Sequence, residues 1–77
     1  MIKQSINFSG HTTDVYLQKY EDDLIISIPD LAFSMKVSTE LSTSDIEQEV
    51  MLQLFSFMDE AECRTLASEI SIAIGKI

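Results

Sequence analysis

Residues 24–37 read LIISIPDLAFSMKV, and this stretch decides the fold class. Leu24 to Ile28 is a short, largely apolar run with the length and composition of a buried strand. Pro29-Asp30 interrupts the run, because proline fixes φ and cannot donate to a strand ladder. From Leu31 to Val37 apolar and polar residues then alternate, as they do in a half-buried strand. The stretch therefore predicts two strands joined by a tight turn.

The residues before this stretch predict two more strands. The first covers residues 2–8 and the second residues 12–20, and both alternate with period two. Ser9-Gly10-His11 supplies the first turn, since glycine tolerates the positive φ that tight turns often need. Glu21-Asp22-Asp23 supplies the second, as a polar break. Because all these connections are short, we expect one antiparallel meander. The residues expected to share one face in these two strands are Ile2, Gln4, Ile6 and Phe8 in the first and Val15 and Leu17 in the second.

The period of the apolar residues changes after residue 43, from that of a strand to that of a helix. Ser44-Asp45-Ile46-Glu47 has the spacing of a capping box, in which the hydroxyl and the Glu each bond to the first helical turn. Apolar residues from Ile46 to Met58 then cover about half of the helix circumference. Leu52 lies outside this apolar stripe.

A second helix is predicted to begin after Asp59, which is a natural N-cap with Glu62 three residues later. Gly75 is expected to end this helix in the left-handed conformation. Residues 68–75 also alternate like a fifth strand, but residues 61–74 contain no Gly or Pro, which favours the helix. The apolar stripe of this helix is Cys63, Leu66, Ala67, Ile70, Ala73, Ile74 and Ile77.

These patterns predict an α+β fold, a four-stranded antiparallel β-meander followed by two α-helices packed on one face, in the order ββββαα. The 77 residues are expected to form a single domain, residues 1–77, with 45% hydrophobic and 23% charged residues as in other globular proteins. The predicted core is Ile6, Val15, Leu17, Ile26, Phe33, Met35, Ile46, Val50, Leu54, Phe57, Leu66 and Ile70.

Residues that carry catalysis or bind metals are scarce in this sequence. One His and one Cys, His11 and Cys63, cannot form a zinc site without carboxylates, and the acids at 21–23 lack the spacing of a calcium loop. A Cys–His pair needs both side chains within hydrogen-bond distance, whereas His11 is expected in a turn and Cys63 on a buried helix face. Two glycines, Gly10 and Gly75, are too few for a phosphate-binding loop. We therefore expect no enzyme, no metal and no cofactor.

The acidic balance is the most unusual feature of the composition. Thirteen Asp and Glu against five Lys and Arg give a net charge of −8. Such a surface repels nucleic acids and anionic membranes, and it favours a basic protein partner. The alternative interpretation is that the acidity only keeps a small protein soluble.

The expected location of the protein is the cytoplasm. Cys63 is the single cysteine, which is too few for a secreted disulfide scaffold and points to a reducing compartment. The chain begins MIKQS without the pattern of a signal peptide, and it contains no apolar stretch long enough for a membrane span.

Two candidate interaction surfaces follow from the sequence. Seven acids and no base lie between Lys36 and Arg64, where both helices are predicted to start, so the two starts are expected to adjoin as a negative surface. The alternative is that these acids only cap the helices. The second surface is the outer face of the sheet, with exposed tyrosines, and apolar residues such as Leu52 and Ile72 off the helical stripes would serve a homodimer. The candidate partner-binding residues are Glu40, Asp45, Glu47, Glu49, Asp59, Glu60, Glu62, Tyr16, Tyr20 and Leu52.

Two functions agree with these surfaces. The first is a small acidic protein-binding module without enzymatic activity, an inhibitor or regulator of the antitoxin or anti-defence kind. It would dock a basic protein by electrostatic complementarity, including by mimicry of a nucleic acid. The second is a structural or assembly subunit that associates with itself through its sheet face or its helices.

Residues 20–55 resemble the HicB-type antitoxin domain. The matching residues are Ile28-Pro29-Asp30-Leu31, at the turn between two strands, and Thr43-Ser44-Asp45-Ile46-Glu47, at the start of a helix. The glycines that this family has after the turn and before the helix are missing here, as is its usual C-terminal DNA-binding module. The resemblance implies binding and neutralisation of a toxin protein.

Overall fold

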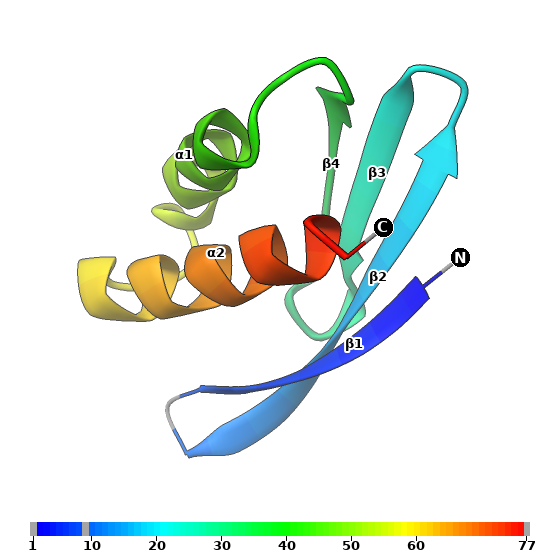
Figure 1. Cartoon of the computed structure of the whole chain (residues 1–77). Coiled ribbons are helices and arrows are strands. Elements are labelled where there is room, and N and C mark those ends of the chain that lie inside the picture. Colours follow the sequence, from blue (N-terminus) through cyan, green and yellow to red (C-terminus); the bar gives the residue numbers. More distant parts are fainter. Residues whose placement is uncertain (1, 9, 77) are drawn as a thin grey trace.

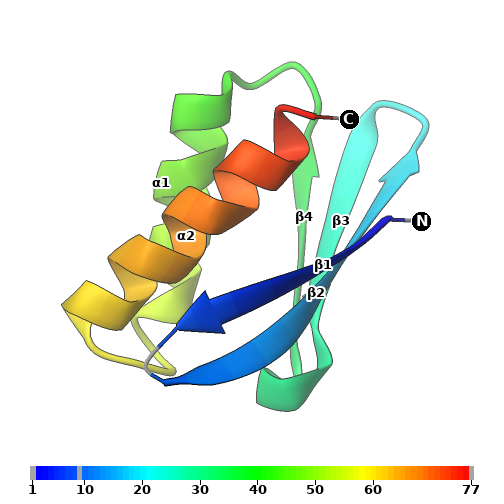
Figure 2. The same ribbon diagram turned by 60° about the horizontal axis from the view of Figure 1, so that its bottom comes forward.

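A computed structural model describes residues 2–8 and 10–76, with Phe8 and His11 described by their backbone alone. Within these residues the chain forms a sheet with the strand order β1-β2-β3-β4, followed by two helices. All neighbouring strands are antiparallel, and both helices cover the same face of the sheet (Figures 1 and 2). The predicted ββββαα order is confirmed. The elements are β1 (Ile2–Phe8), β2 (His11–Tyr20), β3 (Asp23–Ile28), the 3₁₀ turn η1 (Pro29–Leu31), β4 (Phe33–Ser38), α1 (Thr43–Leu54) and α2 (Glu60–Ile74).

The strands are joined by turns with left-handed residues. Phe8 pairs with His11, so β2 begins one residue earlier than predicted, and His11 belongs to the strand instead of the turn. Gly10 has φ 81°, as expected for a tight turn, whereas the prediction for Ser9 lies outside the described residues. Glu21 takes φ 55° in the turn between β2 and β3.

The turn between β3 and β4 differs from the sequence prediction. Leu31 and Ala32 were expected in the fourth strand, but Leu31 belongs to η1 and Ala32 adopts a left-handed conformation with φ 51°. The Ala32 N–H donates to the Pro29 carbonyl at 3.0 Å, which closes a turn. Proline starts the 3₁₀ turn readily because its φ is already fixed. The strand therefore begins only at Phe33.

The core lies between the sheet and the two helices and confirms most of the predicted residues. Val15, Ile26, Val50 and Ile70 are completely buried. Met35 packs against this cluster but is only partly buried. The predictions for the side chain of Phe8 and for the last stripe residue, Ile77, lie outside the described residues. The buried apolar residues are Ile6, Val15, Leu17, Leu24, Ile26, Ile28, Phe33, Val37, Ile46, Val50, Leu54, Cys63, Leu66, Ala67, Ile70 and Ala73.

Phe57 was predicted in the core, and this prediction is wrong. Its side chain is 49% exposed, because α1 ends at Leu54 and Phe57 lies in the connection to α2 instead of on the helix. Its ring nevertheless meets the buried ring of Phe33 edge to face, with centroids 5.5 Å apart.

The helix starts are fixed by side-chain caps. In α1 the cap is Ser42, not Ser44 as predicted, and its Oγ accepts from the Asp45 N–H at 3.1 Å. Both serines lie three residues before an acid, so the spacing alone does not show which of them is the cap. In α2 the predicted cap is confirmed, since Asp59 Oδ1 accepts from the Glu62 N–H at 2.9 Å.

The C-terminal segment is helical, so the alternative prediction of a fifth strand over residues 68–75 is wrong. Gly75 was expected in the left-handed conformation, but it has φ −63° and ψ −15°. Its N–H donates to the Ser71 carbonyl at 3.0 Å, so the helical hydrogen-bond pattern continues through this residue. No helix in the described part of the chain is long and apolar enough to cross a membrane.

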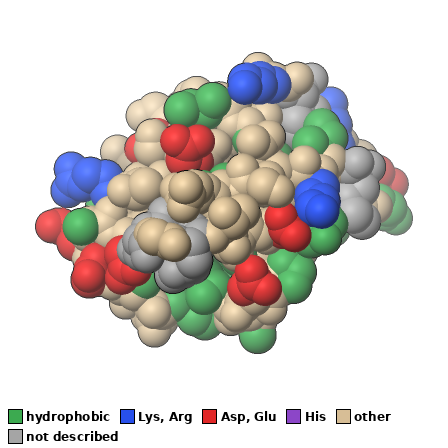
Figure 3. Space-filling model, turned by 90° about the horizontal axis from the view of Figure 1, so that it is seen from below, with side chains coloured by type: hydrophobic (Ala, Val, Ile, Leu, Met, Phe, Trp, Pro, Cys, Tyr) green, Lys and Arg blue, Asp and Glu red, His purple; other side chains and the backbone are tan. Residues whose placement is uncertain are grey.

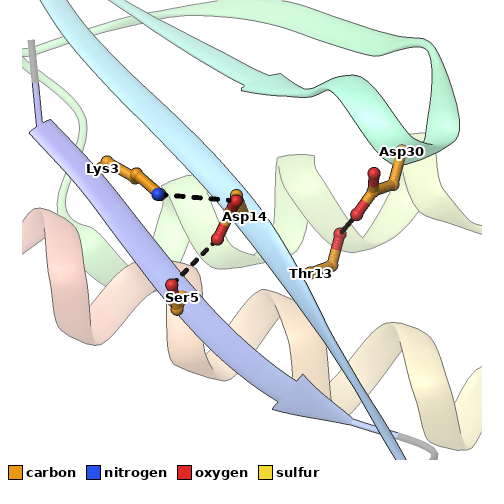
Figure 4. Close-up of polar contacts among 5 residues, drawn as sticks. All are labelled: Lys3, Ser5, Thr13, Asp14 and Asp30. Atoms are coloured by element: carbon orange, nitrogen blue, oxygen red, sulfur yellow. Dashed lines mark hydrogen bonds and ion pairs between the residues drawn. The ribbon is translucent and has the colours of Figure 1, made fainter.

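A partly buried polar contact links β2 to the 3₁₀ turn. Thr13 faces inward between the apolar positions of β2 and is buried, and its Oγ1 donates to Asp30 Oδ2 at 2.7 Å (Figure 4). A buried hydroxyl needs such a partner, because an unpaired polar group in the interior is costly. The sequence patterns did not identify this contact.

Phe33→Ala tests the core. The variant removes a ring that is only 6% exposed, so we expect the free energy of unfolding to fall by about 3–5 kcal/mol. Phe57→Ala removes the half-exposed ring against it and should cost clearly less. Urea denaturation measures both, and a Phe33→Ala variant as stable as the wild type would contradict the core assignment.

Asp30→Ala and Thr13→Val test the contact between β2 and η1. Asp30→Ala leaves the buried Thr13 hydroxyl without its acceptor and should cost about 1–3 kcal/mol. Thr13→Val removes the hydroxyl itself and leaves an exposed carboxylate that water can solvate, so its cost should be smaller. Thermal and urea unfolding give the order, and the reverse order would show that the hydroxyl does not depend on Asp30.

Candidate protein-interaction surface

Negative charge is divided unevenly between the two layers of the molecule. The helical layer, defined as residues 39–76, holds eight acids and two bases, a net charge of −6. The sheet layer, residues 2–38, holds five acids and three bases, a net charge of −2. On the outer face of the sheet, Lys3 lies 3.7 Å from Asp14 (Figure 4), and Lys36 lies 3.8 Å from Asp23. The helical layer is therefore the main source of the negative field.

The acids at the starts of α1 and α2 lie far apart in the helical layer. The start of α1 lies at one end of the helix pair and the start of α2 at the other (Figures 1 and 2). The expectation that the two starts adjoin is therefore wrong. The connection over residues 55–59 turns the chain back, which places the start of α2 beside the end of α1. The 12 residues of α1 span about 18 Å.

Several of the predicted binding acids have structural roles. Asp59 caps α2, and Glu60 Oε1 lies 3.6 Å from the Arg64 guanidinium one turn later. Glu47 is half-buried and accepts from Ser71 Oγ at 3.1 Å, so it links α1 to α2. Glu62 is also half-buried, on the α2 side. The carboxylates of Asp59, Glu60 and Glu47 therefore already have contacts within the fold.

The other three acids are free to meet a partner. Glu40, in the loop before α1, and Asp45 and Glu49, on α1, are exposed. Within the described residues their carboxylates make no hydrogen bond and no ion pair. Nothing in the fold therefore requires their charge, apart from the favourable position of Asp45 in the first turn of α1.

An apolar groove lies on the side of α1 that faces away from the core. This α1 groove has a volume of about 210 Å³ and is lined by Gln48, Met51, Leu52 and Phe55. Leu52 is 61% exposed and Phe55 45% exposed. At 100° per residue, Asp45 and Glu49 fall on the same side of the helix as Leu52. The surface is thus an apolar centre with acids along one edge.

The width of the apolar stripe on α1 explains this groove. Met51 and Phe55 belong to the predicted stripe, but only its other edge, with Val50 and Leu54, is completely covered by the core. Met51 is partly buried, and Phe55 is left largely in solvent. The sequence contained two signals for the groove. The apolar stripe of α1 is wider than the surface that the core covers, and Leu52 lies outside this stripe.

The two tyrosines lie on a different surface. Tyr16 is partly buried and Tyr20 is exposed on the outer face of β2, which the helices leave uncovered (Figure 1). Tyr16 pairs across the sheet with Lys3 and Ser27, so polar residues surround it. The structure therefore does not bring the tyrosines together with Leu52. Seen from below, acidic and basic side chains are interspersed, and several acids gather at the left edge, where α2 begins (Figure 3).

A second cleft opens between the end of the sheet and the helices. Its volume is about 200 Å³ and most of its lining is apolar. Its lining residues are Lys19, Leu24, Thr39, Leu41, Thr43, Ile46 and Ile74.

The thiol of Cys63 is held in its neutral form. Cys63 is completely buried in α2, and its Sγ donates to the Met58 carbonyl at 3.5 Å. Burial raises the pKa of this thiol, and the acids Asp59, Glu62 and Glu60 raise it further. A reactive cysteine needs the opposite environment. The side chain of His11 lies outside the described residues, and among those described no three His, Cys, Asp or Glu are grouped to hold a metal.

The chain matches the model of the YueH-like protein family over residues 2–76. It belongs to this family. No curated protein and no solved structure matches the chain. The resemblance of residues 20–55 to the HicB-type antitoxin domain is not among these matches and stays an expectation.

The buried thiol of this YueH-like chain gives a pH-dependent prediction. An unfolded thiol ionises near its ordinary pKa of 9.0, while the folded one ionises only at higher pH. The contribution of Cys63 to stability should therefore be complete below pH 9.0 and should decrease as the pH rises toward the folded pKa. Urea denaturation at pH 7.5 and 9.5 should show a larger loss in the wild type than in Cys63→Ala. An equal loss in both would contradict the raised pKa.

Proposed function

We propose that this YueH-like chain is a protein-binding module without enzymatic activity, which docks a basic protein partner through its helical layer. The observation that carries this proposal is the uneven division of charge, a net −6 in the helical layer against −2 in the sheet layer. A field of this kind attracts a basic partner and orients it toward one face.

The α1 groove also supports docking through the helical layer. Protein interfaces usually combine a buried apolar centre with a polar rim, and here Leu52 and Phe55 lie beside Asp45 and Glu49. The carboxylates of Asp45 and Glu49 have no partner within the described residues, so a basic partner gains ion pairs without breaking existing ones. We place the protein among small inhibitors or regulators of the antitoxin or anti-defence kind, acting in the cytoplasm. Mimicry of a nucleic acid is one way in which such a surface works.

The state of Cys63 supports the absence of catalysis. The pKa of its thiol is raised by burial and by the neighbouring acids, and a raised pKa disfavours the nucleophilic thiolate. Glu40, Asp45 and Glu49 lie in open solvent, whereas carboxylates that act in catalysis usually lie in an enclosed pocket.

A second candidate function is a structural subunit that associates with itself. The uncovered outer face of the sheet favours it, because Tyr16, Tyr20 and Ile25 are accessible there and the lysines beside them are neutralised by aspartates. Such a dimer would depend little on salt, and light scattering of the purified chain would show a mass that rises with concentration toward twice that of the monomer.

Matched charge reversals test docking through the helical layer. Asp45→Lys/Glu49→Lys changes the net charge by the same amount as Glu21→Lys/Asp22→Lys, which lies in an exposed turn of the sheet layer. A partner captured from the native host should bind the first double variant about tenfold more weakly than the second, and its affinity for the wild type should fall steeply with salt.

Two results would contradict the proposal. One is an equal effect of both double variants on the captured partner. The other is an affinity that does not change with salt, and together with a dimer mass it would favour the structural subunit. Thermal melts of both variants establish that they remain folded.

A further inference from the structure

We infer, on the basis of the proposed function, that the docking element of the partner is a basic amphipathic helix that inserts its apolar side chains into the α1 groove. Three features of the molecule support such a partner: the shape of the groove, the charge beside it and the hydrogen bonding of the α1 backbone.

The groove requires an apolar ligand surface. Three of its four lining side chains are apolar, those of Met51, Leu52 and Phe55, and the fourth, Gln48, is polar. Leu52 and Phe55 are both exposed in the groove, and exposed apolar side chains that adjoin one another often mark an interaction site. From Gln48 to Phe55 the groove runs along about two helical turns, or roughly 12 Å. This length matches apolar residues spaced three and four apart on another helix.

The edge of the groove requires positive charge. Asp45 and Glu49 lie on the same side of α1 as Leu52, and residues 37–63 contain no Lys or Arg. The next base along the chain, Arg64, is already paired with Glu60. Lysines or arginines beside the apolar residues of the partner would therefore meet unpaired carboxylates.

The backbone of α1 favours a helical partner over an extended one. The N–H and C=O groups inside α1 are bonded to one another, so this face offers no edge to which a strand could add. A segment bound here must satisfy its own backbone hydrogen bonds, and a helix does so without help.

A second copy of the chain is a poor occupant of the groove. In a two-fold dimer the same surface patch meets itself, so Asp45 and Glu49 of both copies would lie in one interface. Since α1 carries no base, these like charges would repel each other without compensation. Charge complementarity thus selects a basic partner.

Two synthetic peptides of 14 residues test the inference. Both contain the same numbers of Leu and Lys, but in one the leucines form a single helical face and in the other they are spread around the helix. We expect calorimetric titration to show tighter binding of the amphipathic peptide. Amide NMR shifts should be largest in α1.

Leu52→Asp and Ile72→Asp are the matched variants. Both residues are exposed on helices, at 61% and 52%, and both substitutions add one negative charge. Added negative charge alone would strengthen binding of a basic peptide, so a loss must come from the apolar contact. We expect Leu52→Asp to weaken the amphipathic peptide about tenfold and Ile72→Asp to change it by less than about twofold.

Three results would overturn the inference. They are equal binding of the two peptides, equal effects of the two variants, and a dimer of the chain that Leu52→Asp dissociates. The proposed function is tested separately. If reversal of Asp45 and Glu49 weakens the captured partner while Leu52→Asp does not, docking through the helical layer holds and the helix-in-groove inference fails. If neither change weakens it, both fail.

Discussion

The structure depends on covering one apolar face of a four-stranded sheet. Val15 and Ile26 from the sheet meet Val50 and Ile70 from the helices, and all four are completely buried. A domain of this size buries a modest fraction of its surface and has little stability to spare. Both helices are therefore needed, and the connection over residues 55–59 must return the chain across the same face. The separation of the two helix starts follows from this return.

The same constraint decides which surfaces are left for function. Each helix uses one side for the core, and the sheet uses one face, so the outer sides of the helices and the outer face of the sheet remain. The sheet face is partly neutralised, since Lys3 and Lys36 each lie close to an aspartate. The helical layer keeps most of the net charge, and its α1 groove adds apolar surface beside Asp45 and Glu49. These features together support docking of a basic partner.

The sequence patterns predicted the fold because each element carries its own local signal. Alternation defined β4, and Asp59 with Glu62 defined the start of α2. The patterns failed where two local solutions were equivalent, as for Ser42 and Ser44, or where the end of an element depends on tertiary packing, as for Phe57. The α1 groove was only partly predictable, because the position of a stripe edge relative to the core is set by how the helices pack.

The most direct test of the central claim is amide hydrogen exchange of the chain, free and bound to its partner captured from the native host. Docking through the helical layer should slow exchange mainly over residues 39–56, which cover α1 and the loop before it, and high salt should reduce this protection. Protection confined to β1 or β4, with residues 39–56 unchanged, would contradict it.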